Sequence, residues 1–302
     1  MKLQDPSIKI ILDGNSSDLN RAGKILGEMN PVCDFISLHL YVMPADSGYL
    51  SLLRSVENFN ASFDSLRILL HKIPAKAADF SPWFRFQGRQ FPVKIAVDEW
   101  GIWDANSGKG RGAYQLEYSY EWSHALATGK FLNILQRNAD ITGLASWAQS
   151  VNNLAPIMTN QDGSFRQTVY TPLQAFRKYT LSQNIPVKVN SPMLESGLET
   201  LDATTSISQD KTELVISLLN LAERKAVSTN IGFVHLPENS QLEFQEMISY
   251  TAKSLNVTNT FGENNVKEKT IVPHSFSKEG FDVSVPAASI CFLKFRVLPV
   301  IK

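Results

Sequence analysis

The 302-residue sequence has no net charge and no long apolar run. Lys plus Arg and Asp plus Glu both number 29, and no Lys/Arg-rich segment is present to bind a phosphate backbone. No stretch reaches the about 20 consecutive apolar residues that a membrane-spanning helix needs, and residues 1–6 lack the apolar core of a signal peptide. We therefore expect no nucleic-acid partner, no membrane span and no secretion signal.

Cysteine is also scarce. Cys33 and Cys291 lie far apart in the chain, which argues against a disulfide framework and leaves too few ligands for a Cys/His metal site. The sequence has no glycine-rich phosphate-binding loop, so we expect no cofactor and no metal. Triplets of the glycosylation type begin at Asn15, Asn60 and Asn256, but such triplets often arise by chance and do not identify the compartment.

The composition is that of a globular protein, with 43% hydrophobic and 10% aromatic residues. The first half repeats a strand, loop and helix. Strands are expected at 8–12, 35–42, 93–104 and 141–149, and helices at 18–29, from about 48 to 71 and at 112–138. Such units in series predict a parallel sheet with right-handed crossovers. Polar residues at the C-terminal ends of the strands predict one shared site there.

The second half has a different sequence pattern. From about residue 196, short alternating runs separated by turn residues predict an antiparallel sandwich, with strands at 213–220, 243–250, 281–285 and 290–295. We place the domain boundary between residues 181 and 182 and take 182–192 as the connection. No cluster of metal-ligand spacing accompanies His274, which is interpreted as a surface residue.

Residues 93–104 carry the strongest functional signal. An apolar, β-branched run ends in Asp98 and Glu99, with Trp100 and Trp103 beside them. Buried carboxylates are rare unless they are paired or used, so these acids are expected at the strand tip, where barrel active sites lie. Indole rings can stack on the C–H faces of a sugar. The alternative is an ion-paired acid with two core tryptophans.

The segment from Asp98 to Trp103 resembles the Asp-Glu-Trp-x-x-Trp motif of family 51 glycoside hydrolases, the α-L-arabinofuranosidases. Further resemblances follow in chain order. Residues 5–9 and 35–41 are similar to the family's fifth and sixth barrel strands, 149–159 to the loop after its eighth, and 259–261, 272–273 and 285–289 to its C-terminal sandwich. The resemblance implies an α/β plus all-β fold. Residues 1–181 would form the second half of a (β/α)8 TIM-type barrel, strands five to eight, and residues 182–302 an antiparallel β-sandwich.

The resemblance also implies roles for individual residues. Glu99 matches the catalytic nucleophile. Tyr41 matches a tyrosine that hydrogen-bonds near the nucleophile, and Gln149 a glutamine that orients the nucleophile and the sugar. Trp103 matches an aromatic wall of the sugar site, and His39 a histidine close to it. The alternative is a core tyrosine for Tyr41, an ordinary loop amide for Gln149 and a hydrogen-bonded core histidine for His39.

The acid/base of the family is not recognisable. It is the Glu of a Gly-Asn-Glu motif at the fourth strand, and the dipeptide Asn-Glu occurs nowhere in this sequence. Glu28, Glu57, Glu117 and Glu121 fall in expected helices, where a solvated or ion-paired role is the interpretation. Asp13 lies at a strand tip but matches a position that the family does not use as the acid.

The leading hypothesis is a retaining, exo-acting α-L-arabinofuranosidase that releases terminal arabinose from arabinose-containing glycans and lacks its acid/base Glu. The competing hypothesis is a non-catalytic remnant or a sugar-binding subunit. Four parallel strands cannot close an eight-stranded barrel, and an open edge invites association. The expected partner is a second copy or a missing N-terminal half-barrel. Gly101 and Ile102 replace the family's commoner Asn and Val, which leaves fine specificity open.

Overall fold

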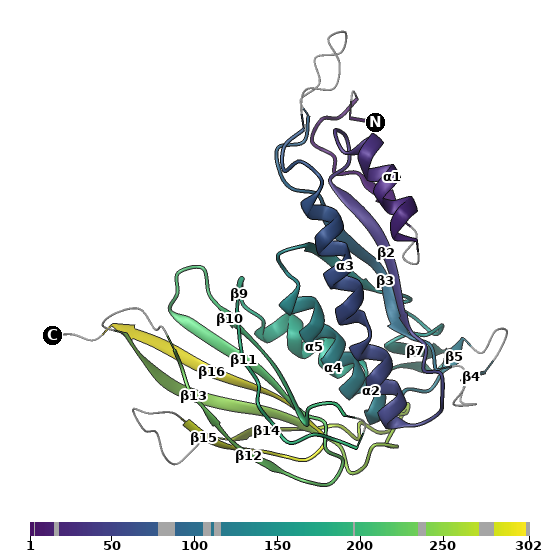
Figure 1. The fold of residues 1–302 in the computed structure, drawn as a ribbon. Coiled ribbons are helices and arrows are strands. Elements are labelled where there is room, and N and C mark those ends of the chain that lie inside the picture. Colours follow the sequence, from purple (N-terminus) through teal and green to yellow (C-terminus); the bar gives the residue numbers. More distant parts are fainter. Residues whose placement is uncertain are drawn as a thin grey trace.

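The structure, a computed structural model, describes residues 1–2, 4–14, 18–77, 88–104, 110–111, 116–195, 197–234, 240–271 and 281–299. The turn residues 15–17, His274 and the 272–273 segment lie outside the described residues. A parallel sheet with its helices forms one half of the molecule, and antiparallel sheets form the other (Figure 1). The fold class expected from the sequence, half of an α/β barrel followed by a sandwich, is thereby confirmed.

The N-terminal half is built on a parallel sheet of four strands in the order β1-β2-β3-β6. These strands are β1 (Ile11–Asp13), β2 (Phe35–Val42), β3 (Lys94–Ile102) and β6 (Thr142–Trp147). The helices are α1 (Leu19–Met29), α2 (Tyr49–Glu57), α3 (Phe59–His71), α4 (Trp122–Arg137) and α5 (Tyr170–Tyr179). Two small antiparallel pairs complete this half: β4 (Gly110–Arg111) with β5 (Glu117–Tyr118), and β7 (Ile157–Asn160) with β8 (Gly163–Arg166).

One face of the parallel sheet is buried and the other is polar. In β2, Ile36, Leu38, Leu40 and Val42 are buried in the main hydrophobic cluster together with apolar side chains of the helices. Strand side chains alternate between the two faces of a sheet, so Ser37, His39 and Tyr41 share the opposite face. The alternation of the sequence therefore decides which side chains of β2 can form a site.

The C-terminal half consists of two antiparallel sheets. The larger has the order β14-β13-β16-β11-β10-β9, and β12 pairs with β15. The strands are β9 (Gln183–Ile185), β10 (Leu201–Ile207), β11 (Glu213–Asn220), β12 (Val227–Ile231), β13 (Ser240–Thr251), β14 (Lys267–Ile271), β15 (Phe281–Val285) and β16 (Ser289–Pro299). Phe244 of the larger sheet stacks on Phe281 of the smaller one, with ring centroids 4.6 Å apart. The two sheets therefore pack face to face as a sandwich.

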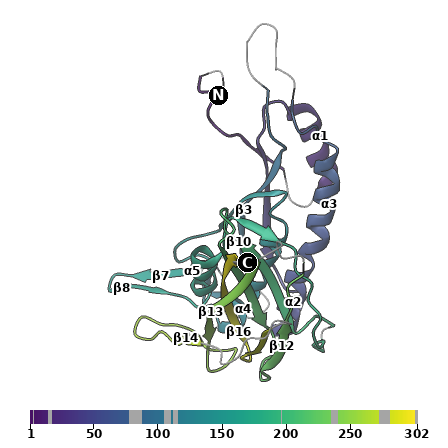
Figure 2. The same cartoon turned by 90° about the vertical axis from the view of Figure 1, so that its left-hand side faces the viewer.

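The two halves share a continuous core. Phe131 of α4 and Phe292 of β16 belong to the same buried cluster. The indole Nε1 of Trp122 donates a 2.7 Å hydrogen bond to the carbonyl of Ala288, and the Tyr49 hydroxyl donates one of 2.9 Å to the carbonyl of Leu221. The views in Figures 1 and 2 place α4 against the sandwich. No helix among the described ranges combines the length and apolar character needed to cross a bilayer.

The structure refines several of the expected elements. The helix expected from about residue 112 begins at Trp122, because the backbone N–H of Glu121 is satisfied by Nδ1 of His124 at 3.1 Å, a contact that marks the first turn. Glu117 therefore lies in a strand and Glu121 at a helix start. The helical stretch before His71 is two helices that meet at Asn58. The connection at 182–192 contains β9, which pairs with β10.

Candidate active site

A β-bulge within β3 creates the site, so the two acids lie inside the strand and not, as expected, at its tip. Ser37 of β2 faces Ala96 of β3, yet His39 faces Glu99, so β3 has one residue more than β2 in this interval. The apolar side chains stay on the buried face both before and after the bulge. Ile95 and Val97 precede it, Trp100 and Ile102 follow it, and all four are buried. Asp98 and Glu99, whose side chains are 33% and 44% exposed, both reach the polar face.

The polar face brings five side chains together. The Tyr41 hydroxyl donates a hydrogen bond of 3.1 Å to Oε2 of Glu99. His39 lies between the two acids, with Nδ1 3.4 Å from Oε2 of Glu99 and Nε2 3.8 Å from Oδ1 of Asp98. The Ser37 hydroxyl donates a 2.7 Å hydrogen bond to Oδ1 of Asp98. The residues that the sequence singled out on β2 and β3 therefore meet.

Sequence reasoning did not single out Ser37 or assign Asp98 a contact. A signal for Ser37 was present, because Ser37, His39 and Tyr41 follow one another at a spacing of two on a predicted strand. Asp98 continues the alternation of Ile95 and Val97 and so lies on the polar face beside Ser37, whereas the bulge moves Glu99 from the buried to the polar face. A regular alternation would have placed Asp98 and Glu99 on opposite faces.

The two tryptophans have different roles. Trp100 is 2% exposed and stacks on Phe131 at 4.6 Å with an interplanar angle of 7°, so it is a core residue and cannot stack on a sugar. Trp103 is half-buried and meets the Tyr41 ring edge-on at 6.4 Å. The expectation that two indoles flank the carboxylate is therefore wrong for Trp100, because the buried face of β3 resumes immediately after the bulge.

Gln149 follows β6 at the same end of the sheet. The backbone N–H of Ala148 donates a 2.8 Å hydrogen bond to the carbonyl of Trp100, which ties this loop to β3. A Cβ atom at Gly101 would lie only 3.1 Å from the Ala148 carbonyl oxygen, so glycine permits this close approach. The Gln149 side chain is exposed and makes no hydrogen bond within the described part of the chain. Its role as an orienting residue stays a prediction.

The electrostatics at Tyr41 favour a protonated phenol. Partial burial, the hydrogen bond to Glu99 and the negative charge of that carboxylate raise the pKa of Tyr41 to about 12. At neutral pH the hydroxyl is therefore a donor to Glu99. The contact leaves one carboxylate oxygen of Glu99 without a bond to Tyr41, and this side chain is 44% exposed. A carboxylate so held can act as a nucleophile toward a ligand on the polar face.

Within the described residues, no second carboxyl group of the family type bonds to Glu99. Glu28 lies in α1, and Glu57 in α2 forms an ion pair with Lys130 at 2.5 Å. Glu117 lies in β5, whose backbone bridges to Asn153 of the loop after β6, and Glu121 lies at the start of α4. Among the residues that the structure describes, none of these four bonds to the Glu99 side chain, and no three His, Cys, Asp or Glu side chains are arranged to hold a metal ion.

Comparison with solved structures identifies the class. An α-L-arabinofuranosidase from Thermotoga maritima superimposes with a TM-score of 0.77 at 24% identity, covering 98% of this chain and 59% of that one. Nearly the whole of this chain therefore shares the fold of part of that enzyme.

Sequence comparison identifies the family. Residues 98–289 match the α-L-arabinofuranosidase C-terminal domain. A probable α-L-arabinofuranosidase C from Aspergillus niger is 30% identical over 76% of this chain and 48% of its own length. An intracellular exo-α-(1→5)-L-arabinofuranosidase from Streptomyces lividans is 24% identical over 91% of this chain and 41% of its own length. The chain belongs to the α-L-arabinofuranosidases of glycoside hydrolase family 51 and spans about half the length of these curated relatives.

Proposed function

We propose that this chain supplies the nucleophile-bearing half of a retaining, exo-acting α-L-arabinofuranosidase. The observation that carries the proposal is the contact between Tyr41 and Glu99, with the hydroxyl 3.1 Å from Oε2 on the polar face of the sheet. Glu99 attacks the anomeric carbon of a terminal arabinofuranosyl residue, and the leaving oxygen departs with the rest of the glycan. Tyr41 holds the carboxylate in place before the attack.

The neighbouring side chains bind the sugar in this proposal. His39, whose side chain is 47% exposed, can donate one hydrogen bond from a neutral ring, either to Glu99 or to a sugar hydroxyl. Trp103 presents part of its indole beside Tyr41 as an apolar wall. Gln149 is exposed and free to bond a hydroxyl of the bound arabinose. These three residues and Tyr41 form the substrate-binding set.

The chemistry requires a partner for Glu99. Retaining glycosidases place a second carboxyl group about 5–5.5 Å from the nucleophile, to protonate the leaving oxygen and then activate water. The sequence contains no Asn-Glu dipeptide, so a half-barrel that carries Gly-Asn-Glu would have to supply the acid. The same partner would pair with β1 and β6 at the open edges of the sheet.

The second candidate function is a sugar-binding subunit or a non-catalytic remnant. It is favoured by the observation that none of the four candidate glutamates bonds to Glu99 within the described part of the chain. Such a protein would keep the aromatic wall and the polar face but would not form a covalent intermediate. The two functions therefore differ in whether Glu99 reacts.

Co-expression with a family half-barrel that carries Gly-Asn-Glu tests the proposal. Release of nitrophenol from a nitrophenyl α-L-arabinofuranoside is expected from the assembly and lost in Glu99→Gln, because an amide is too weak a nucleophile. Mass spectrometry of the quenched reaction should detect a glycosyl adduct on the peptide containing Glu99. Glu28→Gln, the same chemical change on the outer helix α1, is the matched control and should stay active. An active Glu99→Gln assembly would refute the assignment.

A further inference from the structure

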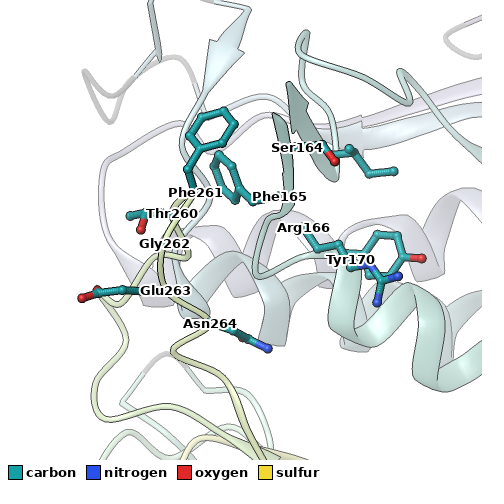
Figure 3. Close-up of a pocket in the computed structure, with 10 residues that line it drawn as sticks. Ser164, Phe165, Arg166, Tyr170, Thr260, Phe261, Gly262, Glu263 and Asn264 are labelled. Carbon is teal, nitrogen blue, oxygen red and sulfur yellow. The ribbon is translucent and has the colours of Figure 1, made fainter. Parts of the chain in front are cut away.

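A cavity of about 560 Å³ lies apart from the polar face of the parallel sheet, between the β7–β8 hairpin and the loop before β14 (Figure 3). One wall comes from the hairpin and the start of α5, with Phe165, Arg166 and Tyr170. The other wall comes from the sandwich, with Phe261 and Glu263. Its volume falls in the range of about 300–1,000 Å³ that is typical of ligand sites.

Hydrogen bonds hold the two walls together. The side-chain amide of Asn259, which is buried, donates a 2.9 Å hydrogen bond to the carbonyl of Arg166, and its Oδ1 accepts one of 2.9 Å from the backbone N–H of Asn265. Between them, Thr260 and Glu263 exchange two backbone hydrogen bonds of 3.0 and 3.4 Å that close a tight turn. The cavity is therefore formed before any ligand binds, which lowers the entropic cost of binding.

Aromatic rings are presented to the cavity instead of being buried. The rings of Phe165 and Phe261 meet edge-on at 4.7 Å, and Phe261 is 50% exposed. The guanidinium of Arg166 lies over the ring of Tyr170 at 4.7 Å, which orients its N–H groups. Two apolar rings next to oriented polar groups match the alternating C–H and hydroxyl surfaces of a sugar.

The charges on the lining residues cancel. Arg166 and Glu263 are the only ionisable pair of opposite sign among them, so the cavity has no net preference for an anion or a cation. Ser164, Thr260 and Asn264 add neutral donors and acceptors. A neutral, hydroxyl-rich ligand fits this lining better than a phosphate or a basic peptide.

We propose that this cavity is a second glycan site that binds a segment of a neutral, pentose-rich polysaccharide away from Glu99. The proposal takes its ligand class from the proposed function. The loop after β6 connects the two places, because Trp147 Nε1 donates a 2.8 Å hydrogen bond to the carbonyl of Leu154, and Val151 bridges to Ile157 of β7. Figure 2 shows the β7–β8 hairpin projecting from the body, where a long chain can reach it.

Affinity electrophoresis in native gels that contain soluble arabinan or arabinoxylan tests the site, with the full chain in its soluble assembly. We expect Phe261→Ala to weaken retardation about two- to tenfold, the range for losing one aromatic contact. Arg166→Gln should weaken it as well. Phe91→Ala removes a phenylalanine that is 68% exposed and does not line the cavity, and it should bind like the parent chain. Near-UV circular dichroism checks that each variant is folded.

The outcomes separate this site from the catalytic one. Retardation that survives Glu99→Gln but not Phe261→Ala supports a second glycan site, even where the assembly proves inactive and the proposed function fails. No retardation of the parent chain, or equal retardation of Phe261→Ala, overturns the proposal. A change in oligomeric state caused by Phe261→Ala, with glycan retardation unaltered, would show that the cavity is a contact between protein chains, and would also overturn it.

Discussion

His39 and Glu99 face each other across β2 and β3, one residue out of the register set by Ser37 and Ala96. The offset places the imidazole between two carboxylates, 3.4 Å from Glu99 and 3.8 Å from Asp98. A neutral imidazole carries one N–H and can donate to only one of them, whereas the protonated ring can donate to both. The bulge therefore brings two acids and a titratable base into one exposed cluster, a combination that a regular strand would not form.

The chain on its own should not turn over an arabinofuranoside. Its parallel sheet has four strands with open edges at β1 and β6, so we expect oligomers or poor solubility. Without an acid to protonate the leaving oxygen, the rate of hydrolysis should also be lower by about 10²–10⁴-fold. Nitrophenol release measured together with light scattering checks both points. Robust release by a monomer, lost in Glu99→Gln, would instead make a carboxylate such as Glu117 the acid.

Tyr41 should titrate at high pH. Burial first, and then the hydrogen bond to Glu99 and its charge, raise the pKa of Tyr41 from 10.0 to about 12. Carbon NMR of labelled tyrosine should show this, with a lower pKa in Glu99→Gln, where burial alone remains. Because the pKa is higher in the folded state, the free energy of unfolding should fall as the pH rises from about 10 to about 12. Tyr41→Phe should make that fall less steep; an unchanged slope would contradict the raised pKa.

Asp202 should be important for stability at the junction of the two halves. Its buried carboxylate accepts hydrogen bonds from Lys130 at 3.1 Å and Arg137 at 3.0 Å, both on α4, and from Asn133 at 2.6 Å. Asp202→Ala removes one of the two carboxylates that pair with the buried Lys130. We therefore expect the free energy of unfolding, measured in urea, to fall by about 3–5 kcal/mol. The matched control is Glu246→Ala, which removes the partly exposed ion pair with Lys294 at 2.8 Å and should cost about 0–1 kcal/mol.

The stabilisation from Asp202 should also depend on pH. Burial raises the pKa of this carboxyl, but Lys130, Arg137 and the hydrogen bonds outweigh it, so the pKa is lowered from 3.8. A lowered pKa in the folded state means that the contribution is present above 3.8 and is lost as the pH falls through the folded value. Asp202→Asn should remove this part of the acid dependence. An identical acid profile in parent and variant would contradict it.

Limited proteolysis should locate the boundary that we propose between residues 181 and 182. Because β9 pairs with β10 over residues 183–185, cleavage is expected just beyond it, at the exposed Lys188. Trypsin followed by mass spectrometry of the fragments checks this, and Lys188→Gln should abolish that cut. Protection at Lys188 together with early cleavage within β3 would contradict the boundary.

The sequence by itself determined the elements and the chemistry that β3 carries. The period-two pattern of residues 35–42 predicts both the bounds of β2 and the shared face of His39 and Tyr41. The apolar run before Asp98 likewise predicts β3 and its acids, and the motif that follows predicts the family. These are local signals, since a strand's alternation and a short motif are complete within about ten residues.

Only the tertiary structure decided which neighbours each side chain has. The bulge that turns Glu99 toward Tyr41 depends on the pairing of β3 with β2, and these two residues are 58 positions apart in the chain. Trp100 and Trp103 look alike in the sequence, yet the packing of Phe131 from α4 makes the first a core residue. The Arg166–Asn259 contact that closes the second cavity joins residues 93 positions apart. Such contacts form when separate elements bury their apolar faces against one another, and no local pattern encodes them.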